Sequence, residues 1–256
     1  MATPRMADAF TFTLSMVVGL APALFLLWFS LRRFDYPRAE RTLFDDRRVF
    51  LALAVGLGWG AVASTLALFV ADMGLAGGLV SVYVLVFALV LLEESFKMAY
   101  LGRRGYRMRF DTTFTGVALG VGSAATLVAA SGILNPAGAS VTVFVVFSIT
   151  MSLMHAVSGA LIGFGAAKGT MGRHYLRAVL ARGVNMLLLV PFFVPAAYGG
   201  DPAVAYVSLG AGLAEGLLLY RYVYAEVLPE TLPKEIRREL RRWRARSAQG
   251  AGRTAR

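Results

Sequence analysis

The sequence predicts an all-α fold, a polytopic bundle of about seven transmembrane helices with the N-terminus outside and the C-terminus inside. Of its 256 residues, 57% are hydrophobic and 16% are charged, and the mean hydropathy is +0.64. Soluble domains have about 45–50% apolar and about 25% charged residues, so the excess of apolar side chains must face lipid. The net charge of +11 is spread over short basic clusters beside the apolar stretches, which is typical of membrane topology rather than of nucleic-acid binding.

Seven stretches are long enough to cross a bilayer, which takes roughly 20 apolar residues. The first of them could instead be a signal peptide, but its apolar run is longer than the usual ~7–15 residues and a double arginine follows it. In chain order we expect the spans at Phe10–Leu31, Val49–Asp72, Leu79–Leu101, Phe110–Leu134, Val141–Ala167, Ala178–Tyr198 and Ala203–Val223. No connection between them is long enough to hold a domain. Residues 1–227 are therefore expected to form one transmembrane domain, and 228–256 a basic cytoplasmic tail.

The orientation follows from the distribution of Lys and Arg, because basic loops stay on the cytoplasmic side. The connections after spans one, three and five carry six, four and three basic residues, whereas those after spans two, four and six carry none. Seven spans with the N-terminus outside fit this alternation at every loop. The absence of cysteine also excludes disulfides and thiolate metal sites.

The tail from Leu228 to Arg256 carries nine basic residues in a short charged helical pattern. We expect it to anchor the topology by lying on anionic lipid at the cytoplasmic face, although a basic helix could also bind a partner. A nucleic-acid partner is not expected. The location that we expect is the plasma (inner) membrane of a prokaryote.

Ionisable residues inside the spans are the candidates for function, because a charge at membrane depth costs a few kcal/mol or more. They are Glu93, Glu94 and Lys97 on span three, His155 on span five, Arg182 on span six, and Glu215 and Arg221 on span seven. At 1.5 Å per residue, Glu94 lies about 13 Å and Asn185 about 12 Å below their cytoplasmic clusters, and His155 about 19 Å. Allowing for tilt, these three polar groups approach one depth.

Depth and helical spacing predict which of these groups form pairs. Arg182 and Glu215 lie shallower, where a salt bridge to each other would neutralise both. Glu93 and Lys97 are spaced i, i+4, which favours a local ion pair and leaves Glu94 as the freer carboxylate. Facing His155, Glu94 could activate water, either through a metal or directly as a general base. The alternative is a buried hydrogen bond between Glu94 and His155 that only joins two helices.

Three motifs in order resemble the PrsW family of intramembrane proteases, which is related to the CAAX-processing prenyl endopeptidases. They lie within residues 90–165. The matching segments are Glu93-Glu94-x-x-Lys97, then Phe110-Asp111 followed by Gly116, Gly120 and Gly122, and then the His155-Ala156 segment that ends in Gly163. The resemblance implies proteolysis of membrane proteins at a site built from Glu93, Glu94, His155 and Asn185, with Lys97 and Asp111 in structural roles.

The sequence also departs from that family. Leu127 and Val128 stand where the family usually has Glu and Asn, and no second His occurs in a span before Asn185, since His174 is expected in a cytoplasmic loop. A zinc site usually needs three protein ligands, so zinc held by Glu94 and His155 would lack one.

Three hypotheses from different classes therefore remain at this stage. The first is an intramembrane endopeptidase in which Glu94 activates water, His155 assists or binds zinc, and Asn185 offers an oxyanion donor. The second is a non-catalytic relative that binds a membrane-protein helix. The third is a transporter with a Glu/His proton relay, although the two halves of the chain show no internal repeat.

Overall fold

The fold is all-helical, as predicted, and the described residues contain no strand. The computed structural model describes residues 9–134 and 140–254, apart from the side chains of 68–77, 134, 196–197, 244 and 247–254. Seven of its helices are long and apolar enough to cross a membrane, which identifies a multi-pass membrane protein. They are α1 (Ala9–Leu31), α2 (Asp46–Gly77), α3 (Leu79–Leu101), α4 (Thr112–Leu134), α5 (Val141–Lys168), α6 (Met171–Phe193) and α7 (Pro202–Tyr222).

Helix α6 differs most from the expected boundaries. It begins at Met171 and ends at Phe193, seven and five residues before the predicted Ala178 and Tyr198. A short 3₁₀ turn, η1 (Pro195–Tyr198), follows it. Arg173 and Arg177 lie within the first two turns of α6 and not in a loop, because basic residues mark the membrane surface and are good helix formers.

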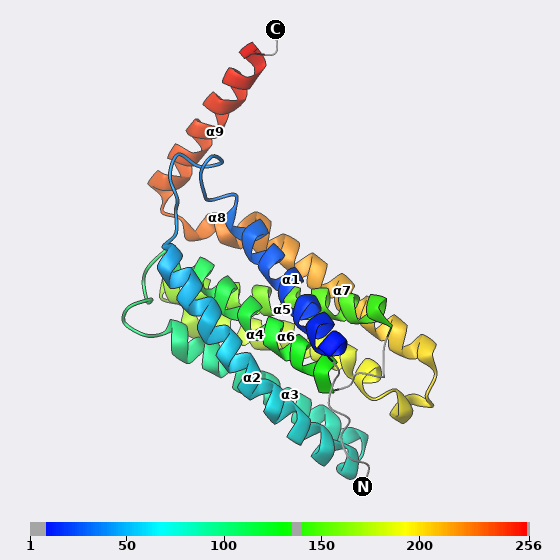
Figure 1. The fold of residues 1–256 in the computed structure, drawn as a ribbon. Coiled ribbons are helices and arrows are strands. Elements are labelled where there is room, and N and C mark those ends of the chain that lie inside the picture. Colours follow the sequence, from blue (N-terminus) through cyan, green and yellow to red (C-terminus); the bar gives the residue numbers. More distant parts are fainter. Residues whose placement is uncertain (1–8, 135–139, 255–256) are drawn as a thin grey trace.

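The chain stays helical across residues 227 and 228, where the basic tail is predicted to begin. Helix α7 continues through a π-helical turn, η2 (Val223–Val227), into α8 (Leu228–Thr231). Leu228 and Leu232 are fully buried in the main apolar core. The hydroxyl of Thr231 donates to the carbonyl of Phe110 over 2.8 Å, which ties this segment to the start of α4. Only α9 (Lys234–Thr254) leaves the bundle (Figure 1).

Helices α4 and α5 form the centre of the bundle, and the other five surround them (Figure 1). Glycine allows the two to touch backbone to backbone: a Cβ on Gly116 would lie 2.1 Å from the carbonyl oxygen of Gly159, and one on Gly120 would lie 2.0 Å from that of His155. Small residues on these two helices thus form a close packing face. This close approach fixes where His155 lies in the centre of the protein.

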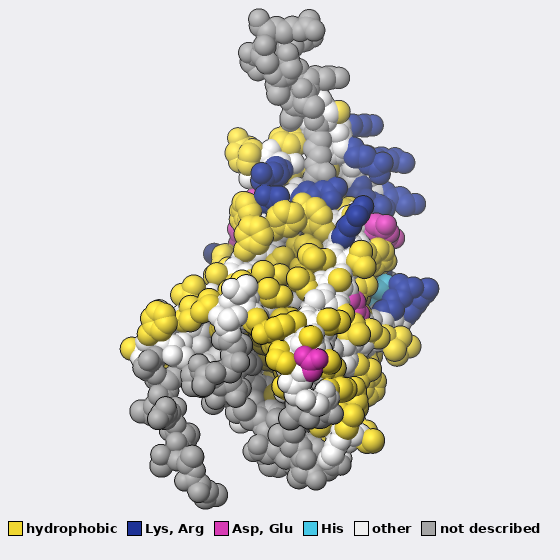
Figure 2. Space-filling model, turned by 90° about the vertical axis from the view of Figure 1, so that its right-hand side faces the viewer, with side chains coloured by type: hydrophobic (Ala, Val, Ile, Leu, Met, Phe, Trp, Pro, Cys, Tyr) yellow, Lys and Arg dark blue, Asp and Glu magenta, His cyan; other side chains and the backbone are white. Residues whose placement is uncertain are grey.

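The charged and apolar surfaces are segregated along the bundle. Figure 2 shows Lys and Arg side chains gathered near the end from which α9 departs, and hydrophobic side chains over the body. The connections α1–α2, α3–α4 and α5–α6 and the start of α9 lie at this end, which we call the basic end. The grouping agrees with the predicted loop alternation. That the basic end is cytoplasmic remains a prediction.

Candidate functional site

A cluster of buried polar side chains lies where α3, α5 and α6 meet. Each member is at most 2% exposed. The members, called the buried polar cluster below, are Glu93, Glu94 and Lys97 on α3, His155 and Ser158 on α5, and Arg182 on α6. Three of the four residues for which the sequence predicted catalytic roles are therefore brought together.

Arg182 is the centre of this cluster. Its Nη2 donates to Glu93 Oε2 over 2.7 Å and also to His155 Nε2. Its Nε lies 3.7 Å from Glu94 Oε1. The carboxylate that faces the imidazole is that of Glu93, with 3.7 Å between Oε2 and His155 Nε2. The predicted direct pair of Glu94 with His155 is therefore replaced by a pair of Glu93 with His155, bridged by Arg182.

The ion pair within α3 also differs from the prediction. Lys97 donates to Glu94 Oε1 over 2.7 Å and to Ser158 Oγ over 2.7 Å. The expected i, i+4 pair of Glu93 with Lys97 is wrong, and an i, i+3 pair takes its place. Both spacings bring side chains together on a helix. Glu93 is instead bonded to Arg182 of α6, which leaves Glu94 as the partner of Lys97.

Asn185 lies outside the buried polar cluster and joins α6 to α7. Its Nδ2 donates to the carbonyl of Gly212 over 2.9 Å and to Glu215 Oε2 over 3.1 Å. The predicted ion pair of Arg182 with Glu215 is wrong, because Asn185 is the partner of Glu215. Depth along the membrane placed Arg182 beside Glu215, but the two side chains leave their helices toward different neighbours.

The charges of the cluster balance. Two carboxylates face one ammonium and one guanidinium, so the net charge is zero while His155 is neutral. Burying an unpaired charge costs a large amount of free energy. The pairing of opposite charges lowers that cost for the four charged groups of the cluster. The sequence indicates that two buried glutamates need two cations, and the structure identifies them as Lys97 and Arg182.

Several atoms of the cluster have no hydrogen-bond partner although they are buried. They are Glu94 Oε2, His155 Nδ1, and Arg182 Nε and Nη1. Buried polar atoms in native proteins are nearly always bonded, so unbonded ones need an explanation. Here a carboxylate oxygen that can accept and N–H groups that can donate belong to the same few side chains, which is what a hydrolytic site requires.

An apolar layer covers the cluster on the side away from the basic end. Val90, Met151 and Met186 each lie one helical turn from a member of the cluster, and all three are at most 8% exposed. Leu127 and Val128 belong to the same layer. Leu127 and Val128 thus contribute apolar side chains to the layer above the buried polar cluster.

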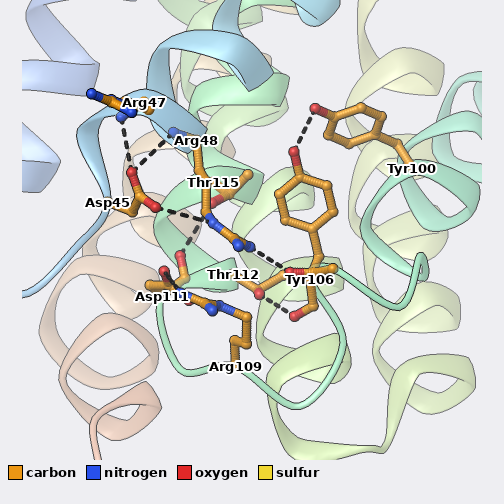
Figure 3. Close-up of polar contacts among 10 residues, drawn as sticks. Asp45, Arg47, Arg48, Tyr100, Tyr106, Arg109, Asp111, Thr112 and Thr115 are labelled. Carbon is orange, nitrogen blue, oxygen red and sulfur yellow. Dashed lines mark hydrogen bonds and ion pairs between the residues drawn. The ribbon is translucent and has the colours of Figure 1, made fainter.

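Further polar contacts lie at the basic end. Asp111, for which a structural role is predicted, accepts two hydrogen bonds from Arg109, 3.0 and 2.9 Å long, just before α4 begins (Figure 3). That hydrogen bonding raises the pKa of the Arg109 guanidinium. Nearby, Arg48 Nε donates a hydrogen bond to Asp45 Oδ2 over 3.1 Å (Figure 3). His174 is not in a loop but is buried on α6, with its Nδ1 beside Thr170.

A metal would find few ligands in the described residues. They contain no group of three or more His, Cys, Asp or Glu side chains suited to hold a metal ion. Glu93, Glu94 and His155 are the candidates within the buried polar cluster, and Arg182 or Lys97 already contacts each of them.

In comparisons with known proteins, no family model matches the chain, and no curated protein or solved structure matches it either. The arrangement of the buried polar cluster is therefore the principal basis for a functional assignment.

Proposed function

We propose that the protein is an intramembrane endopeptidase resembling the PrsW family, which hydrolyses a peptide bond of a membrane protein with a water molecule activated by a buried glutamate. The observation that carries this proposal is the convergence of two carboxylates, an imidazole and a guanidinium from three helices, with unbonded acceptor and donor atoms among them. The order of the sequence motifs supports the same reaction.

Glu94 is the general base in this proposal. Lys97 holds its Oε1, which fixes the orientation of the carboxylate, and its Oε2 has no hydrogen-bond partner. Oε2 can take a proton from water as the water oxygen attacks the peptide carbonyl carbon. The same proton then passes to the departing amine as the C–N bond breaks. Glu93 is less suited to this role, because its Oε2 is bonded to Arg182.

Substrate would reach the cluster between α3 and α6. Helix α3 is the least buried of the seven spans, with 28% of its most apolar stretch inside the protein. Its contacts with α6 and η1 include Ser95 with Tyr175, 2.9 Å between hydroxyls, and Tyr83 with Tyr198. Phe87 covers Gly183 between these levels. Separating the two helices would expose Glu93 and Arg182 to a substrate segment in the lipid.

The test is cleavage of a panel of single-span test proteins by the purified chain in lipid vesicles. We expect Glu94→Gln to abolish cleavage and leave folding nearly intact, because it keeps the shape and removes the base. Glu215→Gln makes the same chemical change in another span and should keep activity. If no member of the panel were cleaved, or if Glu94→Gln cleaved at the normal rate, the proposal would fail.

A second candidate function is a non-catalytic relative that binds a membrane-protein helix. The charge balance of the cluster and its exposure of at most 2% favour this reading, because both are also expected of a purely structural network. The same vesicles separate the two functions. A binding relative would retain test proteins uncleaved, and Glu94→Gln would retain them equally.

The expected partner at the basic end is anionic lipid. Helix α9 carries exposed arginines, including Arg238, Arg241 and Arg242. Leu240 of this helix is buried and belongs to the same apolar core cluster as Leu43 of the α1–α2 connection. Arginine beside a bilayer attracts anionic headgroups by about 1 kcal/mol per residue. This contribution can be measured by comparing binding to anionic and to neutral vesicles, for the whole chain and for a variant that lacks residues 234–256.

A further inference from the structure

The guanidinium of Arg182 fills the space among the two carboxylates and the imidazole. It contacts Glu93 Oε2 at 2.7 Å and Glu94 Oε1 at 3.7 Å, and it is hydrogen-bonded to His155 Nε2. The side chain is 1% exposed. This is the place where a metal ion bound by the same three residues would have to lie.

The cluster does not provide what zinc needs. Zinc is bound through ring-nitrogen lone pairs and carboxylate oxygens, usually by three protein ligands. Here the two N–H groups of Arg182 Nη2 are directed at the lone pair of His155 Nε2 and at Glu93 Oε2. A divalent cation would also lie beside two positive charges, those of Arg182 and Lys97. Arg182 cannot yield its charge, since a guanidinium stays protonated in proteins.

The same contact fixes the tautomer of the imidazole. Arginine can only donate hydrogen bonds, so His155 Nε2 must be the nitrogen with the free lone pair. The ring proton of the neutral imidazole then lies on Nδ1, which is buried and without a partner. His155 in this form presents an N–H donor and cannot act as a base through Nε2.

We propose that Arg182 is the permanent cation of this site in place of a metal. It holds His155 in the Nδ1–H tautomer, and its Nη1, which has no hydrogen-bond partner, is the donor for the carbonyl oxygen of a bound peptide. The donor role rests on the proposed protease function, whereas the tautomer and the exclusion of zinc do not. Arg182 thereby takes the part expected of Asn185, whose amide hydrogens are both engaged by α7.

The proposed hydrolysis needs no reagent other than water. Water adds to the carbonyl carbon and gives its proton to Glu94, and the carbonyl oxygen becomes an anion next to the guanidinium. As the C–N bond breaks, the carbonyl re-forms and the amine takes the proton from Glu94. A fixed positive charge in a site without bulk water stabilises the oxyanion without having to reorganise.

The first test reads the tautomer directly by ¹⁵N NMR. The chain has two histidines, so ¹⁵N-histidine labelling gives two sets of ring signals, and His174→Asn identifies those of His155. We expect a protonated Nδ1 and an unprotonated Nε2 that accepts a hydrogen bond. Arg182→Lys, which keeps the charge, should move the Nε2 signal. A protonated Nε2 in the wild-type protein would overturn the proposal.

The second test measures zinc in the purified protein. After incubation with zinc and removal of the excess, we expect well below one zinc per chain and no shift of the thermal midpoint. Stoichiometric zinc, or a midpoint raised by zinc and lowered by a chelator, would overturn the proposal. Neither readout depends on cleavage, so failure here is distinct from failure of the proposed function.

The third test concerns the donor role. Arg182→Lys should lower kcat by about 10²–10³-fold, as loss of an oxyanion donor does. It should leave KM nearly unchanged, because the lost bond forms mainly in the transition state. A rise in KM at constant kcat would show that Arg182 only binds substrate and would refute the donor role.

Discussion

Replacing Arg182 by Leu should destabilise the protein more than any substitution of a surface arginine. The side chain is 1% exposed, and its loss leaves Glu93 and Glu94 with Lys97 as the single cation of the cluster. A buried carboxylate would then be uncompensated, and His155 Nε2 would lose its donor. The loss of stability therefore comes from the partners left unpaired as well as from the missing arginine.

The magnitude follows from the geometry. Unit charges 2.7 Å apart interact by about 6 kcal/mol at an effective dielectric constant of about 20. Desolvation of both groups offsets much of this gain, and removing one partner of a buried pair costs roughly 3–5 kcal/mol. Arg182→Leu should fall in that range. Glu93→Gln in the same background should recover part of the loss, because it removes the carboxylate left unpaired.

Reversible unfolding in mixed micelles, followed by the fluorescence of the three tryptophans, would measure these free energies. Arg173→Leu on the exposed side of α6 is the matched control and should change stability by less than about 0.5 kcal/mol. Additive effects of Arg182→Leu and Glu93→Gln would refute the pair. Coupling of Arg182 to Glu215 in place of Glu93 would refute the geometry of the buried polar cluster.

Three further predictions address packing, access and topology. Gly159→Ala should cost roughly 1–3 kcal/mol or more in the same assay, because its Cβ would meet the facing backbone at 2.1 Å; Gly210→Ala, which meets nothing within 4 Å, should be neutral or slightly stabilising, and equal effects would contradict the packing. Since the chain has no cysteine, Tyr83→Cys with Tyr198→Cys can be joined by a reducible thiol crosslinker. The link should stop cleavage until it is reduced, and full activity of the linked protein would exclude entry between α3 and α6. A fluorescent protein fused after residue 256 should fold in the cytoplasm, and a dark fusion would argue against the predicted orientation.

Composition and loop charges predict most of the fold, because the bilayer restricts a chain of this kind to apolar helices of a set length. The seven spans and the all-helical class follow from the sequence in this way. Helix ends are harder to predict. Arg173 lies inside α6, because a charge marks the membrane surface and not the end of a helix, and the chain stays helical through Leu228.

The sequence predicted most of the residues that form the candidate site, but not which of them pair with each other. The cost of burying charge is a property of each residue, so the sequence alone determined that Glu93, Glu94 and His155 need partners within the bundle. It could not determine which partners, because depth along a helix says nothing of the direction in which a side chain leaves it. Only the packing of α6 against α3 and α5 brought Arg182 between the carboxylates and the imidazole, and only the packing of α7 engaged Asn185 elsewhere.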